Sequence, residues 1–124
     1  MERPYIICHI LSALDGKITG AFMGTKAVQT VSEEYARIRS EYQADAWLYV
    51  ICGGGTINWT FLQQGAVDEL SLLIAPAADG NPDSVTVFEK SALLPPGSPA
   101  VFQLKNIERL KGDGVRLVYT VKEK

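Results

Sequence analysis

Polar side chains gather directly after the first apolar run of the chain. Ser12, Asp15 and Lys17 follow residues 5–11, which are apolar at nearly every position. A buried strand has this pattern, and in open α/β sheets ligands bind beyond the carboxyl ends of the strands. Asp15 would offer a hydrogen-bond acceptor there, and Lys17 a cation. The alternative is an ordinary Asp-Gly turn, formed by Gly16, beside a solvated lysine.

A glycine turn is the second stretch that could do chemistry. Its residues are Gly53, Gly54, Gly55 and Thr56. They lie between an apolar run, residues 46–52, and a short segment that can be helical as far as Gly65. Glycine lets a ligand approach the main chain closely, and the free N–H groups at a helix N-terminus favour an anion such as phosphate. The turn matches neither a Walker A loop nor Gly-x-Gly-x-x-Gly, so a tight turn without a ligand is the alternative.

Length and composition describe one soluble globular domain, residues 1–124. The chain has 47% hydrophobic and 21% charged residues, a balance typical of globular proteins. Its net charge is −2 and it has no block of like charge, so we expect no nucleic-acid partner. Its apolar runs are too short to span a membrane, and its N-terminus does not resemble a signal peptide. We therefore expect no membrane association and a cytoplasmic location.

The cysteines and the single histidine all lie inside apolar runs. Cys8 and Cys52 are predicted to be buried, reduced thiols. His9 has no second cluster of ligand-type residues to join, so we expect no metal site. A hydrogen-bonded histidine in the core or the sheet is the better interpretation.

The remaining pattern predicts the elements that would position these residues. Strands are expected at residues 5–11, in the centre of the sheet, and at 46–52 and 67–75. A packing helix is expected from Thr30, as N-cap in a capping box with Glu33, to about Gln43. Thr56 is expected to cap the short helix after the glycine turn, and Gly65 to end it.

The last third of the chain is predicted to hold a long loop and a hairpin. Residues 76–99 carry five of the six prolines and, at 85–88, a possible short strand. Residues 101–110 and 115–121 flank a Lys-Gly-Asp-Gly turn, which predicts an antiparallel hairpin.

Three stretches together resemble the riboflavin-biosynthesis reductase domain, which is the C-terminal domain of bacterial RibD proteins. They are residues 3–18, which include Ser-Ala-Leu-Asp-Gly-Lys-Ile, then residues 53–58 with 65–70, and finally residues 74–80. The resemblance implies an α/β fold of the dihydrofolate-reductase type, with flanking helices and a C-terminal antiparallel hairpin. It also implies NADPH as cofactor and reduction of the ribose of a small-molecule substrate, a phosphoribosylamino-pyrimidine.

The resemblance also implies roles for the two chemical stretches. The turn at Gly53, Gly54, Gly55 and Thr56 would hold the phosphates of NADPH. Ser12, Asp15 and Lys17 would line the side of the substrate and the nicotinamide. Asp15 and Lys17 would be the catalytic residues, with the proton supplied near Asp15 and Lys17 countering negative charge.

One departure from the family pattern affects both fold and function. A block of strands and helices is missing between Tyr49 and Ile51, which leaves a shortened mixed sheet of about five strands. The sheet edge that this block covers in the family would be open, so we expect a homodimer. Two alternatives to an active reductase follow, namely a non-catalytic binding or dimerisation module and a partial chain.

Overall fold

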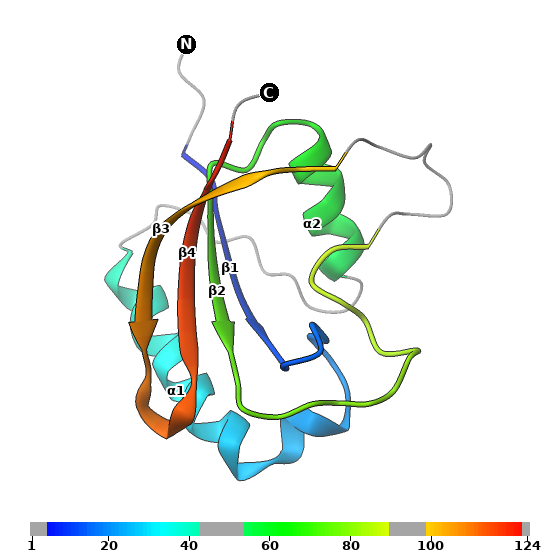
Figure 1. The fold of residues 1–124 in the computed structure, drawn as a ribbon, viewed down its shortest axis with the longest axis vertical. Coiled ribbons are helices and arrows are strands. Elements are labelled where there is room, and N and C mark those ends of the chain that lie inside the picture. Colours follow the sequence, from blue (N-terminus) through cyan, green and yellow to red (C-terminus); the bar gives the residue numbers. More distant parts are fainter. Residues whose placement is uncertain (1–4, 43–53, 90–98, 123–124) are drawn as a thin grey trace.

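The structure, a computed structural model, describes residues 5–42, 54–89 and 99–122, without the side chains of residues 54–58. Figure 1 shows one sheet with a helix on either side. The strands are β1 (Ile7–Ser12), β2 (Glu69–Ile74), β3 (Phe102–Arg109) and β4 (Val115–Val121). The helices are α1 (Lys26–Glu41) and α2 (Gly54–Gln63), with short 3-10 turns at Ala21–Gly24 and Lys111–Asp113.

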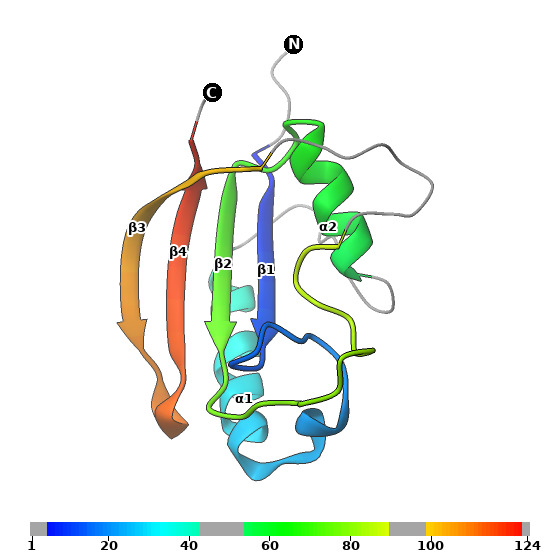
Figure 2. The same cartoon turned by 45° about the vertical axis from the view of Figure 1, so that its right-hand side comes forward.

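The described sheet is mixed, with the strand order β1-β2-β4-β3 (Figure 2). β1 runs parallel to β2, and β4 is antiparallel to both of its neighbours. The mixed α/β class and the C-terminal hairpin are confirmed. The predicted strand at 46–52 lies outside the described residues, so four of about five expected strands are described. Within this part of the chain β1 has one neighbour, β2, and its expected central place stays a prediction.

Two apolar clusters hold the helices to opposite faces of the sheet. Successive strand residues point to opposite faces, so Leu70 and Leu73 belong to different clusters. On one face Leu73 packs with Val28, Val31 and Ile38 of α1. On the other face Leu70 packs with residues of α2 and with two residues of β1. Both faces of the parallel pair are therefore covered, as the unbroken apolar runs predicted.

The start of α1 differs from the prediction. Its N-cap is Thr25, whose hydroxyl accepts a hydrogen bond from the N–H of Val28 at 3.4 Å. Thr30, the predicted N-cap, lies inside the helix, because Val28, two residues earlier, already belongs to the buried stripe. The helix ends at Glu41, close to the predicted end.

The short helix α2 also begins earlier than predicted and ends where predicted. It starts at Gly54, so Thr56 lies inside it and is not its cap. Gly65 ends it with φ of 70°, and its N–H bonds to the carbonyl of Leu62 while the N–H of Ala66 bonds to that of Phe61. This pair of hydrogen bonds is the Schellman arrangement, which favours glycine at the left-handed position.

The long loop contains no strand at residues 85–88. Thr86 forms an isolated antiparallel bridge with Lys17, and the pairing does not extend. Within the described residues no helix is long and apolar enough to cross a membrane.

The two cysteines are only partly described. Cys8 is a buried thiol that forms no disulfide, and burial raises its pKa to about 12. Cys52 lies outside the described residues. The prediction of a buried, reduced thiol is therefore confirmed for Cys8 alone.

Candidate functional site

The turn after β1 brings Ser12, Asp15 and Lys17 to the carboxyl end of the parallel pair. Gly16, with φ of 79°, closes the turn through its N–H, which bonds to the carbonyl of Ala13 at 3.0 Å. Ser12 is buried, and its hydroxyl donates to the same carbonyl at 3.1 Å. The Ser12 hydroxyl therefore faces the fold and not an open cavity.

Asp15 is fully exposed and is engaged by backbone of the long loop. Its carboxylate accepts hydrogen bonds from the N–H groups of Asp79, at 3.1 Å, and Gly80, at 2.9 Å. These hydrogen bonds, that of Gly80 first, lower the pKa of Asp15 below its usual value. The side chain is therefore ionised at neutral pH, which suits an acceptor better than a proton donor.

Lys17 binds the other end of the same loop segment. We call this segment, residues 79–86, the 79–86 loop. Its Nζ donates to the carbonyl oxygens of Ser84 at 3.0 Å and Pro82 at 3.3 Å. The backbone beside it adds two bonds, from the N–H of Ile18 to the carbonyl of Val85 and from that of Val87 to the carbonyl of Gly16. Asp15 and Lys17 thus fix the loop between them. Their catalytic roles stay predictions.

Asp79 fixes the inside of the loop. Its carboxylate accepts from the Ser84 hydroxyl at 2.6 Å and from the N–H groups of Phe22 and Asn81. Gly20 has φ of 134°, and a Cβ there would collide with this carboxylate. Glycine at position 20 therefore lets residues 20–22 close onto the loop.

The N-terminus of α2 lies at the end of the molecule where β1 and β2 finish, as do Ser12, Asp15 and Lys17. α2 leads through a short connection into β2 and runs antiparallel to it, so Gly54 lies toward the end where β1 and β2 finish (Figure 2). No acidic residue lies in the first turn of α2, so no side chain of this turn places a negative charge at the positive end of the helix dipole. Gly53 lies outside the described residues. Of the other predicted cofactor residues, Gly54, Gly55 and Thr56, the structure describes the backbone alone.

A cavity of about 190 Å³ opens between β1 and α1, near the 3-10 turn. Its lining residues are His9, Ile10, Leu11, Ile18, Met23, Ser32 and Tyr35. We call it the His9 pocket. Sequence reasoning treated α1 as a packing helix and missed this pocket. The available signal was a lone histidine in an apolar strand, followed by tyrosines on the inner stripe of the next helix.

His9 itself is held as the sequence predicted, by hydrogen bonds within the sheet and to α1. Nδ1 lies 3.0 Å from the Ser71 hydroxyl, and Nε2 lies 3.0 Å from the carbonyl oxygen of Tyr35. Within the described residues no group of three or more metal-ligating side chains is found.

Comparison with known proteins now decides the family. The family model described as the RibD C-terminal domain matches residues 42–115, which is more than half of the chain. The chain belongs to the RibD C-terminal domain family. The matched range contains the glycine turn, β2 and the hairpin strand β3.

Solved structures of RibD proteins share the fold of this family member. A protein from Shewanella sp. PV-4 described as a riboflavin biosynthesis protein matches with a TM-score of 0.58 and 14% identity, over 97% of this chain and 100% of that one. RibD from Acinetobacter baumannii matches with a TM-score of 0.63 and 13% identity, over 96% of this chain and 58% of that one. A pyrimidine reductase-like protein from Corynebacterium diphtheriae matches with a TM-score of 0.50 and 24% identity, over 58% of this chain and 28% of that one.

These likenesses establish a dihydrofolate-reductase-like fold. The RibD-family chain spans little more than half of the Acinetobacter protein and less than a third of the Corynebacterium protein that it matches. The position at which a block of the family is expected to be missing, between Tyr49 and Ile51, lies outside the described residues, so the missing block stays a prediction.

Proposed function

We propose that the chain is an NADPH-dependent reductase of the riboflavin-biosynthesis type. Its substrate would be a phosphoribosylamino-pyrimidine such as 5-amino-6-(5-phosphoribosylamino)uracil, reduced at the sugar carbon. The observation that carries this proposal is the family match over residues 42–115, which includes the glycine turn. The helix that follows this turn points its N-terminus toward the carboxyl ends of the parallel strands.

Each part of the site would have its own role in this reaction. The first turn of α2, at Gly54, Gly55 and Thr56, together with Gly53, would bind the cofactor phosphates through backbone N–H groups. NADPH, when bound, supplies the hydride. Because its pKa is lowered, Asp15 would act as an ionised acceptor that orders the 79–86 loop, and Lys17 would hold the far side of that loop.

Titration of the purified chain with NADPH, and with NADH in parallel, tests this proposal. We expect NADPH binding that Gly54→Leu weakens at least tenfold, because a side chain would occupy the space nearest the phosphate. Gly24→Leu is the control, since Gly24 has no positive φ and a Cβ there meets no atom within 4 Å. A folded protein that binds neither nucleotide would refute the proposal.

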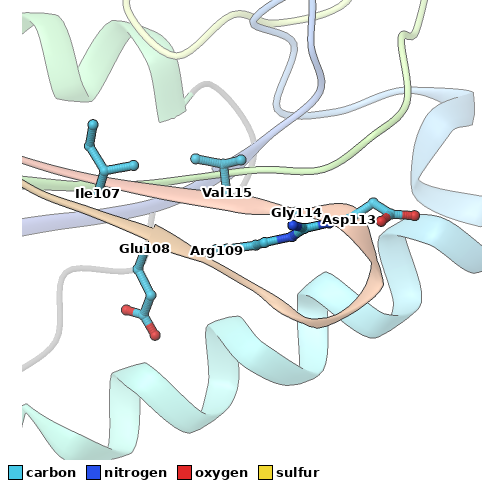
Figure 3. Close-up of a pocket in the computed structure, with 6 residues that line it drawn as sticks. All are labelled: Ile107, Glu108, Arg109, Asp113, Gly114 and Val115. Atoms are coloured by element: carbon cyan, nitrogen blue, oxygen red, sulfur yellow. The ribbon is translucent and has the colours of Figure 1, made fainter.

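A second candidate function, a self-associating module, is favoured by an open apolar face of the sheet. Figure 3 shows Ile107 and Val115 on the side of the hairpin opposite to Glu108, which points toward α1. Ile107 is 63% exposed, Leu104 44% and Val115 36%. The pairing register lines Ile107 up with Leu117 and then Leu72 across three strands.

We infer that a second copy of the same chain would cover this face. We call Leu104, Ile107, Val115 and Leu117 the aliphatic face. These four side chains are uncharged, and Arg109, the cross-strand partner of Val115, borders them with one positive charge. Exposed aliphatic rows of this kind are typical of interaction surfaces. Self-association is compatible with the reductase proposal and would stand without it.

A further inference from the structure

The two ring nitrogens of His9 have different partners, and these set its tautomer. Nε2 faces the carbonyl oxygen of Tyr35, which can only accept a hydrogen bond, so Nε2 carries the proton. In the neutral ring Nδ1 is then an acceptor, and the Ser71 hydroxyl at 3.0 Å is its donor. Both polar atoms of the ring are thus used inside the protein.

Arg116 of β4 completes the arrangement behind Ser71. Its Nε donates to the Ser71 oxygen at 3.0 Å, so this oxygen is an acceptor for Arg116 and keeps its own proton to donate. Two groups lie within reach of that proton, Nδ1 of His9 and the Tyr42 hydroxyl. Nη2 of Arg116 donates to the Tyr42 hydroxyl at 2.6 Å, and its Nη1 lies 3.4 Å from Glu108. The Arg116 side chain is only 14% exposed, whereas Glu108 is 38% exposed, so its contacts with Ser71 and Tyr42 are better shielded from water than the one with Glu108.

The charged and titratable groups around His9 disfavour a second proton on the ring. Arg116 approaches from β4, Arg39 acts from α1, and the Tyr42 ring lies edge-on at 5.7 Å. The one carboxylate on β2, Glu69, is turned to the Tyr42 hydroxyl at 3.2 Å. Burial is the largest cause of the lowered pKa of His9, and the charges of Arg116 and Arg39 add to the lowering, whereas backbone hydrogen bonds at Tyr35 and Ser71 act to raise it.

The plane of the His9 ring is fixed as well. It stacks on the Tyr35 ring with centroids 4.2 Å apart and an angle of 7° between the planes. The Tyr35 hydroxyl bonds back to the His9 carbonyl oxygen at 2.9 Å. Both ring nitrogens already have partners inside the protein, so the neutral ring has no further hydrogen-bonding atom to offer a ligand in the His9 pocket.

We propose that Ser71 and Arg116 are positioning residues, which hold His9 as the neutral Nε2–H tautomer and so give the His9 pocket a rigid, uncharged wall. Such a wall suits a flat, uncharged ring and disfavours an anionic group. The assignment of that ring to the substrate or the cofactor rests on the proposed reductase function. The state of His9 does not.

Nitrogen-15 NMR of the imidazole ring tests the proposal directly, since His9 is the only histidine of the chain. In the wild-type protein at neutral pH we expect a protected Nε2–H proton and an Nδ1 resonance shifted by an accepted hydrogen bond. In Ser71→Ala the Nδ1 resonance should move to the position of an unbonded imidazole nitrogen. An Nδ1–H tautomer in the wild type, or an unmoved Nδ1 resonance in Ser71→Ala, would overturn the proposal.

Two substitutions of Arg116 separate its charge from its hydrogen bonds. Arg116→Gln removes the charge, so the pH midpoint of His9 should rise, whereas Arg116→Lys keeps the charge and should leave the midpoint low. Both should alter the Nδ1 resonance, because both lose the bond from Nε to Ser71. If the Nδ1 resonance and the pH midpoint of His9 are unchanged in Arg116→Gln, the role assigned to Arg116 is wrong. If this variant fails to fold, the spectra of the wild type and of Ser71→Ala decide alone.

Addition of NADPH to the same labelled sample distinguishes this proposal from the proposed function. If the nucleotide binds and a ring enters the His9 pocket, the carbon-bound ring protons of His9 should shift. If calorimetry shows that NADPH binds but the His9 ring protons do not shift, the cofactor ring does not lie in the His9 pocket. No binding at all would refute the cofactor assignment, and the tautomer result would still decide the roles of Ser71 and Arg116.

Discussion

His9 shows how a single buried side chain can make stability depend on pH. The unfolded chain takes up a proton on histidine near its ordinary pKa of about 6.5, whereas the folded chain resists because the pKa of His9 is lowered. Below that pH the unfolded state binds more protons, so the free energy of unfolding falls as the pH falls. The stability contributed by neutral His9 is fully present above the ordinary pKa of histidine. It is lost as the pH falls through the lowered pKa that His9 has in the folded chain.

Thermal unfolding between pH 7 and pH 5 measures this effect. We expect Tm to fall more in the wild type than in His9→Gln, which cannot titrate. Both proteins should be compared in the same buffers, so that the carboxylates contribute equally. Equal slopes for the two proteins would show that His9 is not held neutral.

Asp15 carries a second prediction at the scale of one residue. Asp15→Asn keeps the shape but removes the charge that the N–H groups of Asp79 and Gly80 engage. The 79–86 loop should then be cleaved several-fold faster by a nonspecific protease under native conditions. Asp83→Asn is the matched control, because Asp83 lies in the same loop and no hydrogen bond to its carboxylate is found among the described residues.

Loop cleavage in the wild type should also respond to pH. The pKa of Asp15 is lowered, so its contribution is present at neutral pH and is lost as the pH falls through that lowered value. Equal cleavage rates for Asp15→Asn and Asp83→Asn would count against a role of Asp15 in holding the loop.

At the scale of elements, the true start of α1 can be tested at Thr25. Thr25→Ala removes the acceptor for the Val28 N–H and should lower the free energy of unfolding by about 1 kcal/mol. Thr25→Ser keeps the hydroxyl and should cost much less. Urea denaturation gives both values, and similar losses in the two variants would mean that the methyl group, not the cap, stabilises the helix.

The elements were more predictable than the contacts between them. Periodicity located α1 and the hairpin, because their apolar stripes are local patterns. The capping-box spacing at Thr30 and Glu33 placed the predicted N-cap of α1 five residues after the observed one, Thr25. The contacts of Asp15 and Lys17 join residues more than 60 positions apart, so no local pattern could indicate that these side chains bind the 79–86 loop.

At the scale of the whole molecule, the aliphatic face predicts self-association. Light scattering should show a dimer for the wild type, and Ile107→Asp should give a monomer, because a charge would be buried in the contact. Gln29→Asp adds the same charge at an exposed position of α1 and should leave the dimer intact. A wild type that stays monomeric at high concentration would refute the contact.

The position of β4 has a consequence for how the chain folds. β4 is the last strand in sequence among those described, yet it lies between β2 and β3 in the sheet. Until residues 115–121 are available, β2 has one neighbour among the described strands and β3 has none, and Arg116 cannot reach Ser71. During synthesis, therefore, neither the described sheet nor the fixed ring of His9 can be completed until residues 115–121 have left the ribosome.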